Sequence, residues 1–136
     1  MEGAASRTIR IAAALIDDGD GRLLLVRKAG SRWFMQAGGK IEENESALAA
    51  LRRELAEEIA LELPARDAQY LGRFSAVAAN EPDRIVEAEL FHLRVRHAPV
   101  VQAEIAEAIW IGIAEAADLP LAPLTRDVVL PLAKTL

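Results

Sequence analysis

Residues 38–61 have the sequence GGKIEENESALAALRRELAEEIAL, the most strongly patterned segment of the chain. From residue 46 to residue 59 helix-forming residues dominate, and there is no proline or glycine. Apolar residues recur there at three- and four-residue spacing, which is the stripe of an amphipathic helix: Leu48, Leu51, Leu55 and Ile59. We therefore expect a helix over residues 46–59, and Pro64 limits how far it can continue.

Three glutamates of this expected helix share one part of its surface. At 100° per residue, Glu57 lies about 60° to one side of Glu54 and Glu58 about 40° to the other. Like charges at this spacing repel one another, so the cluster costs stability unless a cation sits among them. Oxygen-only clusters suit Mg²⁺ or Mn²⁺ rather than zinc, and Arg53 is the nearest internal cation. On an isolated surface helix, the same three glutamates would more often form an ordinary solvated face.

The residues around these three glutamates favour a functional cluster over a solvated surface. The segment matches the pattern G-x5-E-x7-R-E-U-x-E-E-x-G-U, where U is a bulky apolar residue. With residue frequencies averaging about 6%, six fixed matches at one starting position arise by chance on the order of once in 10⁷. The matching residues are Gly39, Glu45, Arg53, Glu54, Glu57 and Glu58, with Leu55 and Leu61 at the U positions. Residues 39–61 thus resemble the Nudix box.

This resemblance implies an α/β protein, a Nudix α/β/α sandwich with a mixed sheet and a loop-helix-loop catalytic motif, in a single domain over residues 1–136. Glu57 and Glu58 would be the core ligands of Mg²⁺, for which Mn²⁺ could substitute. Glu54 would be a further metal ligand or the base that activates water, and both alternatives stay open. The backbone carbonyl of Gly39 would complete the metal shell.

The resemblance also implies a supporting pair, Glu45 and Arg53, that fixes the loop against the helix. Two positions depart from the family pattern: Ala60 replaces the last glycine of the box, and Ala37 replaces the proline common before the glycine pair. Glycine after a helix serves as a left-handed cap. With Ala60 we expect the helix to end differently or to run one turn further, without moving the carboxylates upstream, so activity should be retained.

The remaining elements follow from apolar runs and turn signals. Residues 17–21, DDGDG, form a strong turn between the first two strands, which we expect to pair as a hairpin. Strands followed by a helix, then strands and a helix again, indicate a mixed sheet with helices on its faces. Pro131 sits awkwardly in the closing helix and could end it early. The expected strands are 8–17, 22–27, 33–36, 68–77, 84–95 and 109–113, and the closing helix is 125–134.

Composition limits the class of protein. The 136 residues, 52% hydrophobic and 27% charged, suit one folded domain, and no stretch approaches the roughly 20 uncharged apolar residues of a membrane span. A net charge of −5 argues against a nucleic-acid polymer as partner, and an acidic protein needs cations or a few arginines to bind a nucleotide-like small molecule. There is no cysteine, and the first seven residues show no secretory signal, so we expect a cytoplasmic protein. A mean hydropathy of +0.14 suggests apolar surface buried in a homodimer.

Several residues outside the box are weaker candidates. Arg27, Lys28 and Arg32 could reach substrate phosphates, with Arg27 best placed by the resemblance. Trp33, Phe34 and Tyr70 could stack on a base, although large aromatic residues in short strands more often belong to the core.

An extra metal ligand or base could come from later acidic residues. Glu104 is the first choice, and with Glu107 it is expected in a loop or turn before Trp110. Glu87 and Glu89 should point to the same side of their strand. His92 and His97 have no partner at metal-ligand spacing and are taken as ordinary polar residues.

The leading function is Mg²⁺-dependent hydrolysis of the diphosphate linkage in a nucleoside diphosphate derivative. Ala76 stands where family members that act on ADP-ribose have a proline, and residues 77–79 lack the tyrosine of dinucleoside polyphosphate hydrolases. The default substrate is then a nucleoside triphosphate, with noncanonical ones included, cleaved to the monophosphate and pyrophosphate. The alternative is a noncatalytic nucleotide sensor on the same fold. An isoprenoid diphosphate isomerase would need a catalytic cysteine, which the chain lacks.

Overall fold

The computed structural model describes residues 7–136. The stretch 1–6, part of the N-terminus for which the sequence predicts no secretory signal, lies outside the described residues. Seven strands of the described chain form one mixed sheet, and helical segments follow the fourth and seventh strands. The elements are β1 (Thr8–Asp17), β2 (Arg22–Lys28), β3 (Phe34–Met35), β4 (Gly38–Lys40), α2 (Ala47–Ile59), η1 (Ala65–Asp67), β5 (Gln69–Val77), β6 (Ile85–Arg94), β7 (Ile105–Gly112), α3 (Ile113–Ala116), η2 (Thr125–Val129) and α4 (Leu130–Ala133).

Strand β1 is the centre of the sheet. It runs parallel to β6 along its whole length, and β5 continues the sheet antiparallel to β6. On its other side β1 pairs with the short β4 and, at Asp17, with β2. Strand β2 in turn pairs with β3 and β7. The expected β1–β2 hairpin exists, but the two strands pair only at Asp17 and Leu23. Most of β1 pairs instead with strands that come later in the chain.

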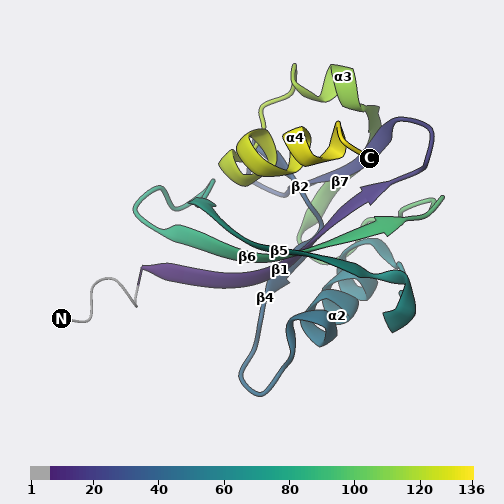
Figure 1. Ribbon diagram of the computed structural model, residues 1–136. Helices are drawn as coiled ribbons and strands as arrows, with labels where there is room; N and C mark the ends of the chain where they lie inside the picture. The colour runs from purple at the N-terminus through teal and green to yellow at the C-terminus, as the bar shows by residue number, and fades with distance from the viewer. Residues whose placement is uncertain (1–6) are drawn as a thin grey trace.

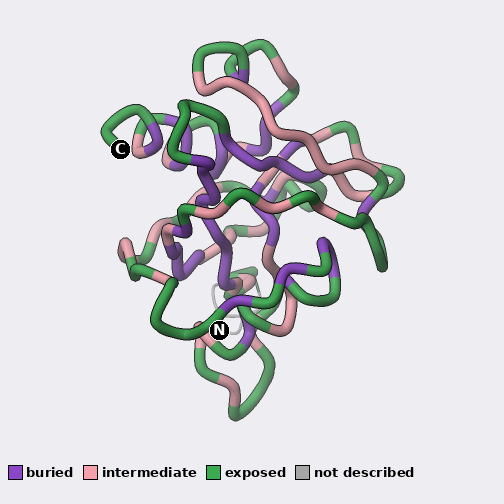
Figure 2. Tube along the Cα trace, turned by 90° about the vertical axis from the view of Figure 1, so that its right-hand side faces the viewer, coloured by how far each residue is buried: buried purple, intermediate pink, exposed green. Residues whose placement is uncertain are grey.

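Helices cover both faces of this sheet, as the α/β/α class predicts. Figure 1 shows α2 on one side of the strands and α3 with α4 on the other. Alternate residues of β1 point to opposite faces of the sheet. Ala12, Ala14 and Ile16 pack towards α2, whereas Ala13 and Leu15 pack towards α4. The buried residues follow the centre of the fold, and the exposed ones lie on the outer loops (Figure 2).

Small residues on β1 and β4 bring the backbone of residues 38–40 close to the sheet. Gly38 pairs with Ala13, and its φ is +145°. A Cβ at Gly38 would lie 2.2 Å from the carbonyl oxygen of Ala12. Only glycine fits there, because it combines an unusual backbone conformation with the absence of a side chain.

The structure corrects three details of the expected elements. Strand β7 begins at Ile105, four residues before the expected start, so Glu107 lies in a strand, while Glu104 lies in the turn before it as expected. Pro131 does not end the last helical segment, which runs through η2 and α4 to Ala133. Its first five residues, Thr125–Val129, form a π-helical turn, a local widening of the helix, shortly before Pro131. Within the described residues, no helix is long and apolar enough to cross a membrane.

Candidate active site

Both ends of α2 are fixed by local interactions. At the start, the Ser46 hydroxyl oxygen accepts a hydrogen bond from the Ala49 amide at 3.0 Å, so Ser46 is the N-cap. At the end, Ala60 itself adopts the left-handed conformation with φ +57°, and its amide donates to the Leu55 carbonyl. The expectation that the helix ends differently or runs on is wrong, because alanine takes the position of the family's glycine at a cost in backbone strain.

Arg53 connects the loop before α2 with the acidic residues on the helix. Its guanidinium donates two hydrogen bonds to the Glu45 carboxylate, both 2.9 Å long. It also donates to Glu54 at 2.7 Å and to the Lys40 carbonyl at 3.1 Å, and it lies 3.5 Å from Glu57. Arg53 holds the pKa of Glu45 down at about 2, so the pair stays charged across the neutral range. The supporting pair expected from the sequence therefore forms, with Arg53 as the cation among the carboxylates.

Glu54 lies directly against the backbone of Gly39. A Cβ at Gly39 would lie 2.7 Å from both carboxylate oxygens of Glu54, so any side chain there would displace this carboxylate. The Glu54 side chain is mostly shielded, with 18% of its surface exposed. Absence of a side chain at Gly39 thus lets the Glu54 carboxylate approach the backbone of the loop.

Glu58 is the buried member of the acidic cluster, with 4% of its surface exposed. Its Oε1 accepts a hydrogen bond from the Gly38 amide at 3.1 Å. Burial, helped by the negative charges of Glu54 and Glu104, raises the pKa of Glu58 to about 7, against the opposing effects of the Gly38 amide and Lys28. Glu104 and Lys28, both outside the box, are thus near enough to influence the charge of Glu58.

The segment that follows β6 holds the C-terminal end of α2. The last turn of α2 has no basic residue and carries Glu57 and Glu58, an unfavourable arrangement at the negative end of a helix. The side-chain amide of Gln102 donates to the carbonyls of Ala56 and Glu57 at 3.0 and 3.2 Å. The Gln102 backbone amide donates to the carbonyl of Glu58 at 3.0 Å. These donors satisfy carbonyl groups that the helix leaves open.

The carbonyl of Ile59, the last residue of α2, also accepts hydrogen bonds from this segment. The donors are the Val100 amide, at 3.2 Å, and His97 Nε2, at 2.8 Å. His97, taken from the sequence as an ordinary polar residue, thus contacts the end of α2. His92, taken in the same way, lies beside Asp17 at 2.5 Å, away from the acidic helix.

Sequence reasoning did not find Gln102, because a lone glutamine in a loop gives no signal by spacing. It becomes visible only when the fold brings residues 97–104 against α2. The same segment delivers Glu104, whose carbonyl accepts a hydrogen bond from the Ala29 amide at 2.8 Å.

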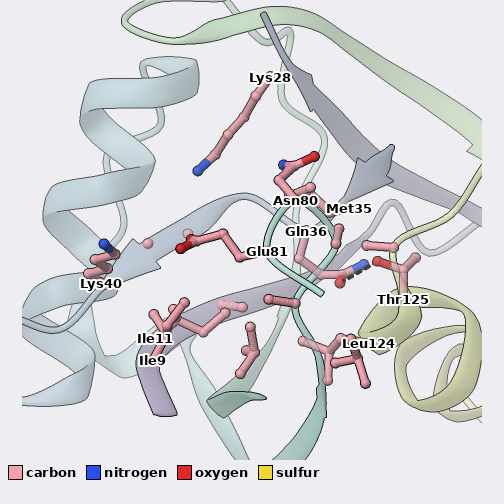
Figure 3. A pocket seen from close by; sticks show the side chains of 18 residues that line it. Ile9, Ile11, Lys28, Met35, Gln36, Lys40, Asn80, Glu81, Leu124 and Thr125 are labelled. Carbon is pink, nitrogen blue, oxygen red and sulfur yellow. Dashed lines mark hydrogen bonds between the residues drawn. The ribbon is translucent and has the colours of Figure 1, made fainter. Parts of the chain in front are cut away.

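A pocket of about 170 Å³ opens beside the box, on the α4 face of the sheet. Gly38, Gly39 and Lys40 form part of its wall. In Figure 3 the side chains of Lys28 and Lys40 extend towards α2, while Gln36 and Thr125 meet at the other end of the pocket. The pocket therefore connects a cationic end beside the acidic helix with a polar end below the last helical segment.

The residues predicted to bind substrate lie beside this pocket rather than in its lining. Arg27 forms an ion pair with Glu107 at 3.0 Å and donates to the Ser31 carbonyl at 2.9 Å. Trp33 is partly buried under the guanidinium of Arg32, which lies 4.6 Å from the ring centroid. Lys28, the neighbour of Arg27 in β2, lines the pocket instead. Substrate contact by Arg27 and Trp33 stays a prediction.

Glu87 and Glu89 lie on the same side of β6, as expected, and both are engaged by arginine. Glu89 accepts hydrogen bonds from the Tyr70 hydroxyl at 2.6 Å and from Arg73 at 2.8 Å. Arg10 lies 3.5 Å from each of the two carboxylates. Tyr70 is thus a surface residue, whereas Phe34 belongs to the core. These contacts account for Glu87 and Glu89 without a metal.

The donor set of the box fits a hard divalent cation by its chemistry. All the side-chain donors are carboxylate oxygens, and the buried Glu58 carboxylate forms no ion pair within residues 7–136. Within residues 7–136, no three acidic or histidine side chains are already gathered around one point as a metal would gather them. Arg53 instead occupies Glu54 and approaches Glu57, so cation binding requires these two side chains to turn from Arg53.

Comparison with known proteins agrees with this geometry. The NUDIX domain family model matches residues 7–132. The CTP pyrophosphohydrolase of Escherichia coli (strain K12) is 35% identical over 127 residues, which cover 86% of this chain and 85% of that protein. The solution structure of the E. coli ORF135 protein has a TM-score of 0.70 at 30% identity, covering 90% of this chain and 86% of the other. The MutT protein from Methanosarcina mazei Go1 has a TM-score of 0.77 over 94% of both chains, and at 23% identity it shows the fold alone.

The chain belongs to the Nudix family, since the family model spans nearly all of the described residues. Within that family it is a pyrophosphohydrolase, an enzyme that acts on nucleotide derivatives.

Proposed function

We propose that the protein hydrolyses a nucleoside triphosphate to the monophosphate and pyrophosphate, with Mg²⁺ as the metal and Mn²⁺ as a substitute. The observation that carries this proposal is the pocket whose wall includes Gly38, Gly39 and Lys40, next to the acidic residues of α2. The E. coli relative named CTP pyrophosphohydrolase makes CTP the first substrate to test. Noncanonical nucleoside triphosphates come next.

In this proposal Glu54, Glu57 and Glu58 hold the metal, with the Gly39 carbonyl and Glu104 as further ligands. A bound divalent cation neutralises charge on the diphosphate and activates the attacking water. The Gly38 amide orients Glu58, and the absence of a side chain at Gly39 leaves room for Glu54. Glu54 is either a ligand or the base that takes the proton from water, and the two roles stay open.

Glu45 and Arg53 support this site without needing to touch the substrate. Their bidentate pair ties the loop of residues 40–45 to α2, and the Arg53 guanidinium also fixes Glu54. Lys28 and Lys40 lie where substrate phosphates would pass from the pocket to the box. In an acidic protein these two cations, together with the metal, offset the repulsion between glutamates and phosphates.

The test is product analysis by chromatography over a panel of nucleoside triphosphates, nucleotide sugars, dinucleotides and coenzyme A. The proposal predicts monophosphate and pyrophosphate from a triphosphate in Mg²⁺, and no product in EDTA. Calorimetry on the same panel separates the enzyme from a noncatalytic sensor, which would bind a nucleotide and release no product over hours. Hydrolysis that persists in EDTA would refute the metal mechanism.

The proposal includes a cytoplasmic location and a homodimer, for which the supporting features are the lack of cysteine and the mean hydropathy of +0.14. It includes no membrane and no nucleic-acid polymer as partner. Light scattering at micromolar concentration tests the dimer, and a mass near 14.7 kDa would contradict it.

A further inference from the structure

The polar end of the pocket contains a buried amide group with an unmet hydrogen-bonding requirement. Gln36 is 7% exposed and lies between β3 and β4, two residues before Gly38. Its Nε2 is buried and has no hydrogen-bond partner in the described part of the chain. It is the one side-chain nitrogen or oxygen atom with this property among the described residues. An amide nitrogen buried in this state costs stability, so its presence beside a pocket points to a ligand.

The orientation of the amide follows from its neighbour. The buried hydroxyl of Thr125 donates to Gln36 Oε1 at 2.9 Å. This arrangement satisfies both the hydroxyl hydrogen and the amide oxygen, and leaves only the two N–H groups of Gln36 open. Turning the amide over would leave both the oxygen and the hydroxyl hydrogen without a partner. Thr125 therefore fixes Gln36 as a hydrogen-bond donor.

The N–H groups of Gln36 lie at the end of the pocket where the base of a bound nucleotide would lie, because the diphosphate would lie at the other end, beside the box. Lys28, Lys40 and the box are at one end of the pocket, and Gln36 and Thr125 line the other (Figure 3). Between these ends the wall is mostly apolar, with Ile9, Ile11 and Leu124 among its residues. A flat heterocycle with polar atoms on its edge suits an apolar wall that ends in an oriented donor.

We propose that Gln36 determines specificity, by donating a hydrogen bond from Nε2 to an acceptor atom on the edge of the nucleobase. The acceptor is a ring nitrogen or a carbonyl oxygen, and Thr125 is a positioning residue that holds the amide. This inference rests on the proposed function, because it assigns the base of the same nucleotide substrate. Bases that place an N–H group opposite Nε2 are rejected, since two donors would then face each other in a buried site.

The experiment compares wild-type protein with the Gln36→Met, Thr125→Val double variant over CTP, UTP, ATP and GTP in Mg²⁺. Methionine keeps the length of the glutamine side chain and valine keeps the shape of threonine, so no hydroxyl or amide is left unpaired. For the preferred nucleotide, kcat/KM should fall roughly 10-fold, mainly through KM, because one hydrogen bond to the base is lost. For the disfavoured nucleotides kcat/KM should change little, so the discrimination collapses.

The stability of the double variant is a second readout. If Gln36 and Thr125 had a purely structural role, their replacement should lower the stability. Removing the unpaired donor together with its partner hydroxyl should leave the urea midpoint unchanged or raise it. The Thr125→Val variant alone should lose discrimination partially, because its amide is free to turn. A double variant that folds and loses kcat/KM equally for all four nucleotides, or for none, would overturn the assignment.

The proposal can also be tested if the protein binds nucleotides without hydrolysing them. In that case the proposed function fails, whereas the ratio of calorimetric Kd values between nucleotides, measured with Ca²⁺ as the divalent cation, still tests Gln36. The double variant should reduce this ratio roughly 10-fold. An unchanged ratio, or no nucleotide binding by the wild-type protein, would overturn the proposal.

Discussion

Replacement of Glu58 by glutamine should stabilise the metal-free protein at alkaline pH while it abolishes turnover. Burial raises the pKa of Glu58 to about 7 in the folded protein, from an ordinary value of 4.5. Between these values the unfolded chain releases the proton while the folded protein still retains it, so the free energy of unfolding falls as the pH rises. The loss begins near pH 4.5 and levels off above pH 7. Its full size is about 3 kcal/mol, at about 1.4 kcal/mol per unit of pKa difference.

Glutamine imitates the protonated carboxyl, and its Oε1 can still accept the hydrogen bond from the Gly38 amide. The Glu58→Gln variant should therefore be more stable than the wild type by less than about 1 kcal/mol at pH 5 in EDTA, and exceed its thermal midpoint at pH 8 by about 10 °C. The matched control is Glu57→Gln, because the Glu57 side chain is 52% exposed and carries no buried charge. Its stability should stay within about 0.5 kcal/mol of the wild type at both pH values, although its turnover is also lost.

These expectations are tested by thermal unfolding of the three proteins at the two pH values, first with EDTA and then with excess Mg²⁺. Mg²⁺ should raise the midpoint of the wild type more than that of either variant, because only the wild type keeps the complete ligand set. The reasoning is refuted if the advantage of Glu58→Gln is the same at pH 5 and pH 8. Full Mg²⁺-dependent activity in both variants would refute the metal assignment itself.

Three further changes test how the motif is held in place. Ala60→Gly should stabilise the protein by about 1 kcal/mol in urea unfolding with kcat unchanged, because glycine adopts the left-handed cap without strain; no gain would mean that Ala60 is not strained. Gly38→Ala should destabilise the fold by about 3 kcal/mol or more in the same assay, since its Cβ would meet the Ala12 carbonyl, and wild-type stability would contradict this contact. Gln102→Met should raise the Mg²⁺ concentration for half-maximal activity by about 3- to 10-fold, whereas Gln102→Lys, which can still donate to the carbonyls of α2, should stay near wild type; equal behaviour of the two would refute a role for these donors.

The local pattern of the box was enough to predict its helix and most of the arrangement around Arg53. The apolar stripe and the absence of glycine or proline gave a helix that begins within one residue of the expected start, with Ser46 as its cap. The resemblance to the Nudix box implied the pair of Glu45 with Arg53, which the structure contains in bidentate form. Both features depend on residues close in sequence, and such interactions leave a periodic signature.

Features that depend on long-range contacts were missed or misjudged. The cap at Ala60 was expected to fail because alanine disfavours the left-handed region, yet hydrogen bonds from residues 97–102 fix the end of α2 and override this preference. The ion pair of Arg27 with Glu107 was likewise not visible from the sequence, because it depends on the pairing of β2 with β7, and phosphate contact by Arg27 stays a prediction. No local pattern could identify Gln36 and Thr125 as partners, since 89 residues separate them.

The arrangement of charges explains how an acidic protein can keep an acidic cluster stable before a cation arrives. Arg53 neutralises the charge of Glu45 through two hydrogen bonds that also hold the loop before α2. Its contact with Glu54 uses a single nitrogen, Nη1, which is also 3.5 Å from Glu57. A divalent cation can therefore replace Arg53 as the partner of Glu54 and Glu57 without breaking the pair that holds the loop. Glu58 has no such cation in contact and instead relies on burial, the Gly38 amide and a raised pKa. Under the proposed function, the box separates the Glu45–Arg53 ion pair, which supports the structure, from carboxylates whose charge would become favourable when a cation binds.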